Sequence, residues 1–203
     1  MKIIGLTGPS GAGKGVLASH LAASGIPIID ADRVYHDLLV PPSLCLDALV
    51  SEFGKEILAE DGTLDRAALA ALVFAEDTAS VTRREALNRI THRFVAQKTQ
   101  EMLECMRLQG HKAAVIDAPL LLEAGMDKIC DVVVAVLADR ETRLGRLIKR
   151  DGKDRDVLLS RINAQPDDDF YTSRADVVVI NNGSEAHLKE QSDLILARVE
   201  LAL

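Results

Sequence analysis

Short apolar runs alternate with longer amphipathic segments along most of the chain. Five of these runs have the length and apolar content of buried strands. They cover residues 2–7, 26–30, 113–117, 131–137 and 176–180. Helical spacing fills the gaps, as in residues 14–24, where Val16, Leu17 and Leu21 share one face before Gly25. Strands that alternate with helices predict an α/β fold, a three-layer sandwich with a five-stranded parallel sheet.

The pattern is different between residues 33 and 110. Pro41-Pro42 interrupts the chain early, and Asp61-Gly62 marks a turn. Helical spacing covers most of the remainder, and the expected helices are 44–53, 65–74 and 78–108. We therefore expect a single domain over 1–203, with a helical insertion at about 33–110 and a closing amphipathic helix over 185–203.

Composition narrows the possible partners. The 203 residues are 48% hydrophobic and carry a net charge of −7. Aromatic residues make up only 3%, so base stacking of the kind used by single-strand binders is not expected. An acidic chain lacks the broad basic footprint of a nucleic-acid-binding protein, so any phosphate must be bound at a local site.

The same sequence favours a cytoplasmic protein. The three cysteines are far apart and lack metal-ligand spacing, which fits a reducing compartment. The N-terminus lacks a signal-peptide layout, and no apolar run approaches the roughly 20 residues that cross a bilayer. We expect neither a membrane nor a nucleic acid as partner.

A glycine-rich segment after the first strand carries the strongest chemical signal. Gly8-Pro9-Ser10-Gly11-Ala12-Gly13-Lys14 matches G-x-x-x-x-G-K and precedes a helix, which is the context of a P-loop. Glycines let several backbone N–H groups point at one phosphate, and the helix N-terminus adds its positive dipole. The predicted nucleotide-binding residues are Gly8, Ser10, Gly11, Ala12, Gly13, Lys14, Gly15 and Val16. The alternative is a plain glycine turn, which does not explain the lysine.

Gly15 stands where many P-loops place a Ser or Thr hydroxyl on Mg²⁺. The G-A-G-K-G form resembles the loops of adenylate and cytidylate kinases, which also carry glycine there. We therefore expect ATP and Mg²⁺ as cofactors, with the ion held by ATP phosphates, waters and distant carboxylates. Asp32 and Asp117 are the candidates for such a carboxylate.

Acidic residues follow two of the predicted strands. Asp30-Ala31-Asp32 ends the second strand, where open α/β sheets bind their ligands. One of these carboxylates could accept the proton of an attacking hydroxyl, but spacing does not choose between the two, and Asp32 could equally cap a helix. Asp117 ends another strand, where it could hold a magnesium-bound water or cap the next helix.

Basic residues concentrate between Arg140 and Arg161, where eight stand against four acidic ones. Arg143, Arg146 and Arg150 share one helical face. Beside a P-loop, this favours a lid over about 140–165 that brings Arg146 and Arg150 to the transferring phosphoryl group. The alternative is a solvated helix face with local ion pairs.

Five segments, spread from end to end of the chain, resemble the dephospho-CoA kinase family. They are Ile4-Gly5-Leu6-Thr7-Gly8 with the P-loop, Asp30-Ala31-Asp32, Asp61-Gly62-x-Leu64-Asp65-Arg66-x-x-Leu69, Pro119-Leu120-Leu121-x-Glu123 and Ala175-Asp176-x-Val178-x-x-Asn181-Asn182-Gly183. The resemblance implies transfer of the ATP γ-phosphate to the ribose 3′-hydroxyl of dephospho-CoA, the last step of coenzyme A biosynthesis. We also expect a monomer.

The resemblance implies roles for individual residues. The catalytic set is Asp32 as base with Lys14, Arg146 and Arg150, and the substrate-binding set is Asp32, Arg66, His92 and Leu121. The fork geometry of Arg66 suits an acceptor phosphate, but Arg66 could also be a surface residue beside a capping Asp65. His92 could equally pack between helices. The resemblance favours Asn181 and Asn182 on the nucleotide side, and the alternative is an ordinary Asn-Gly turn. The chain departs from the family pattern at Pro9, Ala12 and Gly15, and has His92-Arg93 in place of His-Pro.

Three other functions fit parts of the sequence. A cytidylate-type kinase shares the fold and the loop, but its acceptor is a phosphate and needs no catalytic aspartate. A GTP-dependent switch usually reads guanine with an N-K-x-D segment, which this sequence lacks. A kinase-like protein without activity is suggested only by Gly15.

Overall fold

A computed structural model describes residues 1–75 and 77–200. The chain divides into two compact units. The core unit comprises Met1–Asp30 and Leu103–Leu203, and the helical unit comprises Ala31–Met102.

The core unit contains a parallel sheet with the strand order β2-β3-β1-β4-β5. The strands are β1 (Lys2–Thr7), β2 (Ile28–Asp30), β3 (Ala113–Asp117), β4 (Val132–Leu137) and β5 (Val177–Ile180). The predicted five-stranded parallel sheet is confirmed. β2, β4 and β5 begin one or two residues later than their apolar runs suggested, because the residues before them lead into the sheet without pairing as strand.

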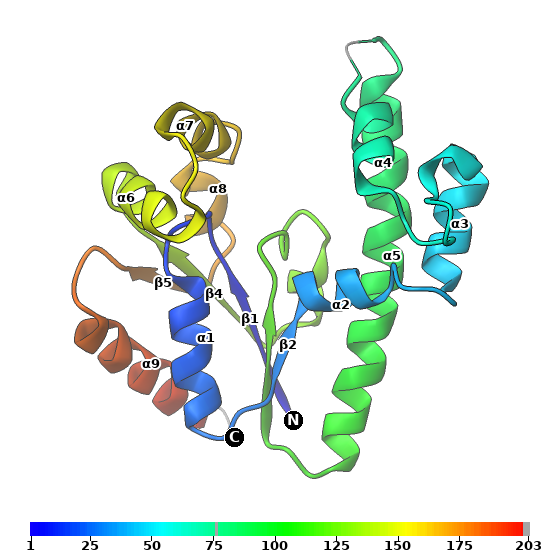
Figure 1. Cartoon of the computed structure of the whole chain (residues 1–203). Coiled ribbons are helices and arrows are strands. Elements are labelled where there is room, and N and C mark those ends of the chain that lie inside the picture. Colours follow the sequence, from blue (N-terminus) through cyan, green and yellow to red (C-terminus); the bar gives the residue numbers. More distant parts are fainter. Residues whose placement is uncertain (76, 201–203) are drawn as a thin grey trace. The chain divides into compact units, whose positions relative to one another are not determined.

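Two helices cover one face of this sheet. Ile4, Val115 and Val134 of the central strands pack in one apolar cluster with side chains of α1 (Lys14–Ala23) and α9 (Glu185–Glu200). The two helices lie side by side in Figure 1. Near-continuous Val, Ile and Leu in the strands are expected of a parallel sheet covered by helices. The predicted closing helix ends at residue 200, and residues 201–203 lie outside the described residues.

The basic stretch folds as a helical hairpin in the core unit. Its helices are α6 (Arg140–Asp151) and α7 (Arg155–Asn163), joined at Gly152, which adopts a left-handed conformation with φ 61°. Leu144, Leu147, Leu158 and Ile162 form the apolar cluster between them. The short α8 (Asp168–Thr172) follows, and the 3₁₀ turn η2 (Met126–Ile129) precedes β4.

The helical unit has an apolar core of its own. It contains α2 (Ala31–Asp37), α3 (Leu44–Phe53), η1 (Lys55–Ile57), α4 (Arg66–Val73) and the part of α5 (Ser80–Leu108) that ends at Met102. Side chains from all of these elements join the cluster around Leu49, Ile57 and Ile90. Ser43 and Asp65 cap α3 and α4 through their side-chain oxygens, as sequences of this type predict.

Across the described part of the chain, no helix is both long and apolar enough to cross a membrane.

Candidate active site

The glycine-rich loop connects β1 to α1 at the middle of the sheet. β1 lies between β3 and β4, so the loop stands where the strand order changes direction, which is where open α/β sheets bind ligands. Gly8 has φ 141°, and a Cβ there would collide with the carbonyl oxygen of Val136. Gly13 has φ 101°, and a Cβ there would meet the side-chain amide of Asn181. Both positions therefore require glycine.

The first turn of α1 is left available for an anion. Gly13 is the N-cap residue and has no side chain that could satisfy the first N–H groups. Gly15 and Val16 are exposed, and the first turn carries no acidic residue. The free end of a helix dipole next to a glycine-rich loop is a phosphate-binding arrangement.

Lys14 and Asp117 form an ion pair beside this loop. The Lys14 ammonium donates a hydrogen bond to Asp117 Oδ1, and the two side chains are only 15% and 13% exposed. Asp117 ends β3 and is the register partner of Asp30, which ends β2. The structure thus brings together two residues that the sequence had suggested for separate tasks, and it adds Asp30 to the same sheet edge.

The carbonyl side of the loop is held by side chains from distant elements. Asn181, 5% exposed, donates from Nδ2 to the carbonyl oxygen of Ala12 at 2.7 Å. Arg146 donates to the same oxygen at 3.1 Å and to that of Gly11 at 3.4 Å. Asn181 therefore supports the loop in this state, whereas its sequence pattern had suggested adenine. Asn182 accepts a hydrogen bond from the backbone N–H of Asp139 at 2.8 Å.

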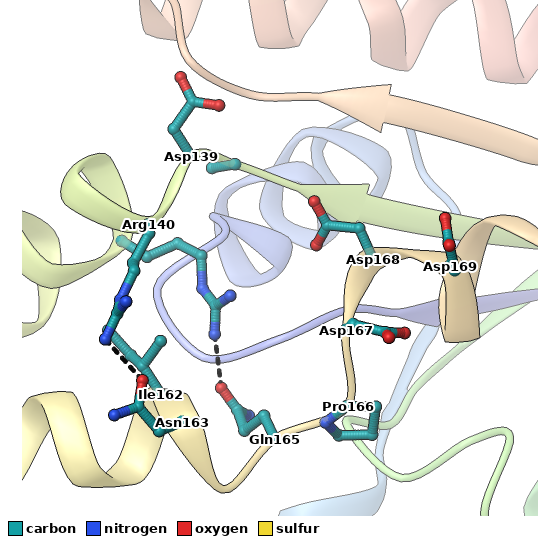
Figure 2. Close-up of a pocket in the computed structure, with 11 residues that line it drawn as sticks. Asp139, Arg140, Ile162, Asn163, Gln165, Pro166, Asp167, Asp168 and Asp169 are labelled. Atoms are coloured by element: carbon teal, nitrogen blue, oxygen red, sulfur yellow. Dashed lines mark hydrogen bonds between the residues drawn. The ribbon is translucent and has the colours of Figure 1, made fainter.

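Two further residues at this loop, Arg143 and Gln165, lie within the predicted lid, but the sequence assigned neither of them an individual contact. Gln165 Oε1 accepts hydrogen bonds from the Ser10 backbone N–H at 3.1 Å and from Arg143 Nη2 at 2.7 Å. Both residues line an open pocket of about 590 Å³ between α6, α7 and α8, where Figure 2 draws the bond to Gln165 as a dashed line. In the sequence, the only indication that Arg143 lies near the loop was its position on the same helix face as Arg146.

Arg150 is oriented differently from Arg146. Its guanidinium donates to Asp151 at 2.6 and 3.1 Å, and its side chain is 59% exposed. Arg161 contacts the same carboxylate at 3.2 Å, and the hydrogen bond from Arg150 lowers the pKa of Asp151. In this state Arg146 contacts the loop, while Arg150 belongs to a local ion-pair group.

In the helical unit, Asp32 lies in the first turn of α2 and is exposed. His36 follows one turn later on the same face. Arg66 Nη2 lies 2.5 Å from His36 Nδ1, and because a guanidinium only donates, Nδ1 must accept and the proton must be on Nε2. The sequence-based prediction included Asp32 and Arg66 and missed His36, which no motif singled out.

The other two predicted substrate residues lie in different surroundings. His92, in α5 of the helical unit, is half-buried, and this burial lowers its pKa. Leu121, in the core unit, is fully buried and packs near Gly5 of β1. Its neighbour Leu120 is the exposed member of the pair. In this state Leu121 presents no surface to a ligand.

The carboxylates near the loop are of a kind that would suit a magnesium ion shared with a bound nucleotide. Within residues 1–75 and 77–200, no group of three or more His, Cys, Asp or Glu side chains could bind a metal by itself. Magnesium, however, is commonly bound through one or two carboxylates together with substrate phosphates and water. Asp117, with Asp30 in register beside it, supplies that kind of donor.

A phosphate loop at the switch point of a five-stranded parallel sheet, with a basic helical hairpin beside it, defines a kinase of the P-loop class. The family model for dephospho-CoA kinase matches residues 2–187. The chain belongs to the dephospho-CoA kinase family, and the predictions of family and of kinase class are confirmed.

Individual relatives agree with this assignment. A dephospho-CoA kinase from Corynebacterium efficiens is 40% identical over 196 residues, which are 97% of this chain and 96% of the relative. A Thermus thermophilus protein of known structure is 30% identical, with a TM-score of 0.80 and 97% of each chain covered. A dephospho-CoA kinase from Campylobacter jejuni shares the fold at 23% identity, with a TM-score of 0.71 and 98% of each chain covered.

Proposed function

We propose that this chain transfers the γ-phosphoryl group of ATP to the ribose 3′-hydroxyl of dephospho-CoA, which gives CoA and ADP. This is the final step of coenzyme A biosynthesis. The observation that carries the proposal is the phosphate loop, with Lys14 at its end and Arg146 on its carbonyl side, in a member of this family.

The loop binds the ATP phosphates. The backbone from Gly8 to Val16 supplies N–H donors, and Lys14 supplies a full positive charge. When ATP binds, Lys14 exchanges its contact with Asp117 for contacts with phosphate oxygens. Asn181 and Asn182 belong to the nucleotide side of the site. Asn181 holds the loop through Ala12, and Asn182 is an exposed residue that accepts a hydrogen bond from Asp139.

Asp32 acts as the general base. As the 3′-oxygen forms its bond to the γ-phosphorus, the bond from that phosphorus to the bridging oxygen of ADP breaks, and the hydroxyl proton passes to the Asp32 carboxylate. Arg66 and His36 present a guanidinium and an Nε2–H on the acceptor side, where both can donate to anionic oxygens of dephospho-CoA. His92 contributes to the acceptor site, and Leu121, which is fully buried in this structure, would have to become exposed before it could contact the substrate.

The insertion and the lid have separate tasks within one P-loop kinase domain over 1–203. The insertion at about 33–110 binds the acceptor, and the lid at about 140–165 covers the phosphates. The chain works as a monomer in the cytoplasm. The acidic net charge of −7 supports a small-molecule substrate over a nucleic acid.

Arg150 acts after it releases Asp151 and turns to the phosphoryl group. Arg150→Met is expected to lower kcat about tenfold or more, because an interaction made only in the transition state affects the chemical step. The dissociation constant for ATP should change by less than about twofold. Steady-state kinetics and equilibrium ATP binding measure the two effects. Lys149→Met, which removes a neighbouring exposed charge, is the control, and equal losses in kcat and ATP affinity would contradict this role.

Magnesium, when bound with ATP, neutralises charge that develops on the phosphate oxygens. Asp117→Asn is expected to raise the Mg²⁺ concentration for half-maximal activity about tenfold, because an outer-shell carboxylate orients metal-bound water. A magnesium titration at saturating ATP measures this value. Asp131→Asn is the control, since Asp131 pairs with Lys2 at the start of β1, at the opposite edge of the sheet. An unchanged magnesium requirement in Asp117→Asn would exclude Asp117 from this role.

One assay tests the proposed reaction directly. The protein is incubated with Mg-ATP and, separately, dephospho-CoA, CMP, AMP or adenosine, and the release of ADP is measured. We expect rapid turnover with dephospho-CoA and a 3′-phosphorylated product by mass spectrometry. Faster turnover with CMP would instead identify a nucleoside monophosphate kinase.

A further inference from the structure

The outer side of the phosphate loop carries an unusual set of hydrogen bonds. When the N–H groups of a tight loop turn toward an anion, its carbonyl oxygens turn away and need donors of their own if they are buried. Three successive carbonyl oxygens, those of Ser10, Gly11 and Ala12, accept hydrogen bonds from side chains. Arg146 donates to the carbonyl oxygens of both Gly11 and Ala12. Asn181 also donates to that of Ala12, and Arg143 donates to that of Ser10.

Ser10 is held at all three of its polar groups. Its carbonyl oxygen accepts from Arg143 Nε at 3.0 Å, and its N–H donates to Gln165 Oε1 at 3.1 Å. Its hydroxyl accepts from Gln165 Nε2 at 3.2 Å. Arg143 Nη2 closes the ring by donating to Gln165 Oε1 at 2.7 Å. Gln165, beyond the end of α7, thus joins α6 to the tip of the loop.

The charge of Arg143 is not needed for these contacts. The residue is only 6% exposed, and the hydrogen bonds of its side chain go to a carbonyl and an amide oxygen, both neutral. Burial lowers the pKa of this guanidinium, an effect that the Asp168 carboxylate partly offsets. A buried cation whose contacts are neutral is costly unless an anion compensates it, and a bound phosphate beside the loop would do so.

We propose that Arg143 and Gln165 are positioning residues of the ATP site. Together they hold Ser10, and through it the loop, in the shape that presents N–H groups to the phosphates before nucleotide arrives. The Arg143 charge also raises the positive potential at the loop. This inference rests on the proposed use of ATP, and it assigns both residues to nucleotide affinity, because neither contacts the reacting atoms.

Substitutions at Arg143 separate charge from hydrogen bonding. Arg143→Met removes both and should weaken ATP binding about tenfold, whereas Arg143→Lys keeps the charge and should lose less. The KM for dephospho-CoA should stay within about twofold of wild type in both variants. The matched control is Arg140→Met. Arg140 lies on the same helix and lines the same pocket, but its guanidinium donates to Asn163, and its loss should leave ATP affinity unchanged.

The dissociation constant is measured by calorimetry with ATP alone, so the result does not depend on the acceptor. If the wild type binds ATP but does not phosphorylate dephospho-CoA, the proposed reaction fails while this test remains valid. Gln165→Leu should weaken ATP binding several-fold, and the double variant with Arg143→Met should lose less than the product of the single effects, because both act through Ser10.

Three outcomes would overturn the inference. They are unchanged ATP affinity in Arg143→Met, an equal loss in Arg140→Met, and a parallel rise in the KM for dephospho-CoA. Circular dichroism and thermal melting report folding. If Arg143→Met does not fold, Gln165→Leu decides the question, because it leaves the guanidinium in place and removes both of the Gln165 bonds to Ser10.

Discussion

Replacing Lys14 with alanine is expected to lower kcat for phosphoryl transfer at least about a hundredfold, because it removes a fixed positive charge that faces the developing phosphate charge. The protein should still fold, since Lys14 is outside the apolar clusters of the core unit. The loss of its contact leaves Asp117 without the lysine, so a small decrease in melting temperature is also expected. Coupled ADP-release kinetics and thermal melting measure the two effects.

The control for this variant is Lys2→Ala. Lys2 also forms a lysine–aspartate pair, with Asp131 at 3.2 Å, and it lies on β1 at the end away from the loop. Its replacement should leave kcat within about twofold of wild type, since surface ion pairs contribute little to stability. Near-normal turnover in Lys14→Ala would show that the loop does not bind the transferring phosphate, and the proposed function would fail with it.

The second large effect is expected at Asp32. Asp32→Asn should lower kcat by about 10²- to 10⁴-fold, the usual contribution of a general base, while ATP affinity stays near that of wild type. The amide keeps the shape and exposure of the side chain but cannot accept the hydroxyl proton. Single-turnover assays with dephospho-CoA, together with ATP binding, separate the chemical step from affinity.

Two other aspartates make this experiment decisive. Asp30→Asn tests the alternative that sequence spacing left open, and it should have the smaller effect on kcat of the two. Asp37→Asn, at the end of α2, removes an exposed carboxylate whose partner is Arg33 at 3.9 Å, and its kcat should be normal. A larger loss in Asp30→Asn than in Asp32→Asn would transfer the role of base to Asp30.

Local sequence was sufficient for the elements and for the loop. The strands β1 and β3 match their predicted bounds, because a short apolar run bounded by polar residues and turn signals is typical of a strand covered on both faces. The loop was recognisable because its glycines and lysine form a local motif, and Gly8 and Gly13 adopt positive φ angles that favour glycine. Helix caps such as Asp65 are local in the same way.

The arginines of the basic stretch could not be assigned in this way. Arg146 and Arg150 have the same chemistry and lie one turn apart, so their spacing predicts a single shared task. The structure instead places Arg146 on the loop and Arg150 on Asp151. Arg146 meets the loop because the fold brings α6 beside a segment 134 residues away in sequence, whereas Arg150 pairs with the adjacent Asp151, and helical periodicity does not distinguish these two cases.

What the sequence by itself determined is therefore the order of strands and helices, the position of the phosphate loop and the family. Tertiary structure alone decided how the loop is supported. Arg143 reaches Ser10 across 133 residues of sequence, and Asn181 reaches Ala12 across 169. Such contacts form because the folded sheet brings distant chain segments together and because buried carbonyl groups require hydrogen-bond donors. Any nearby donor could meet that requirement, so the sequence alone does not identify which side chain does.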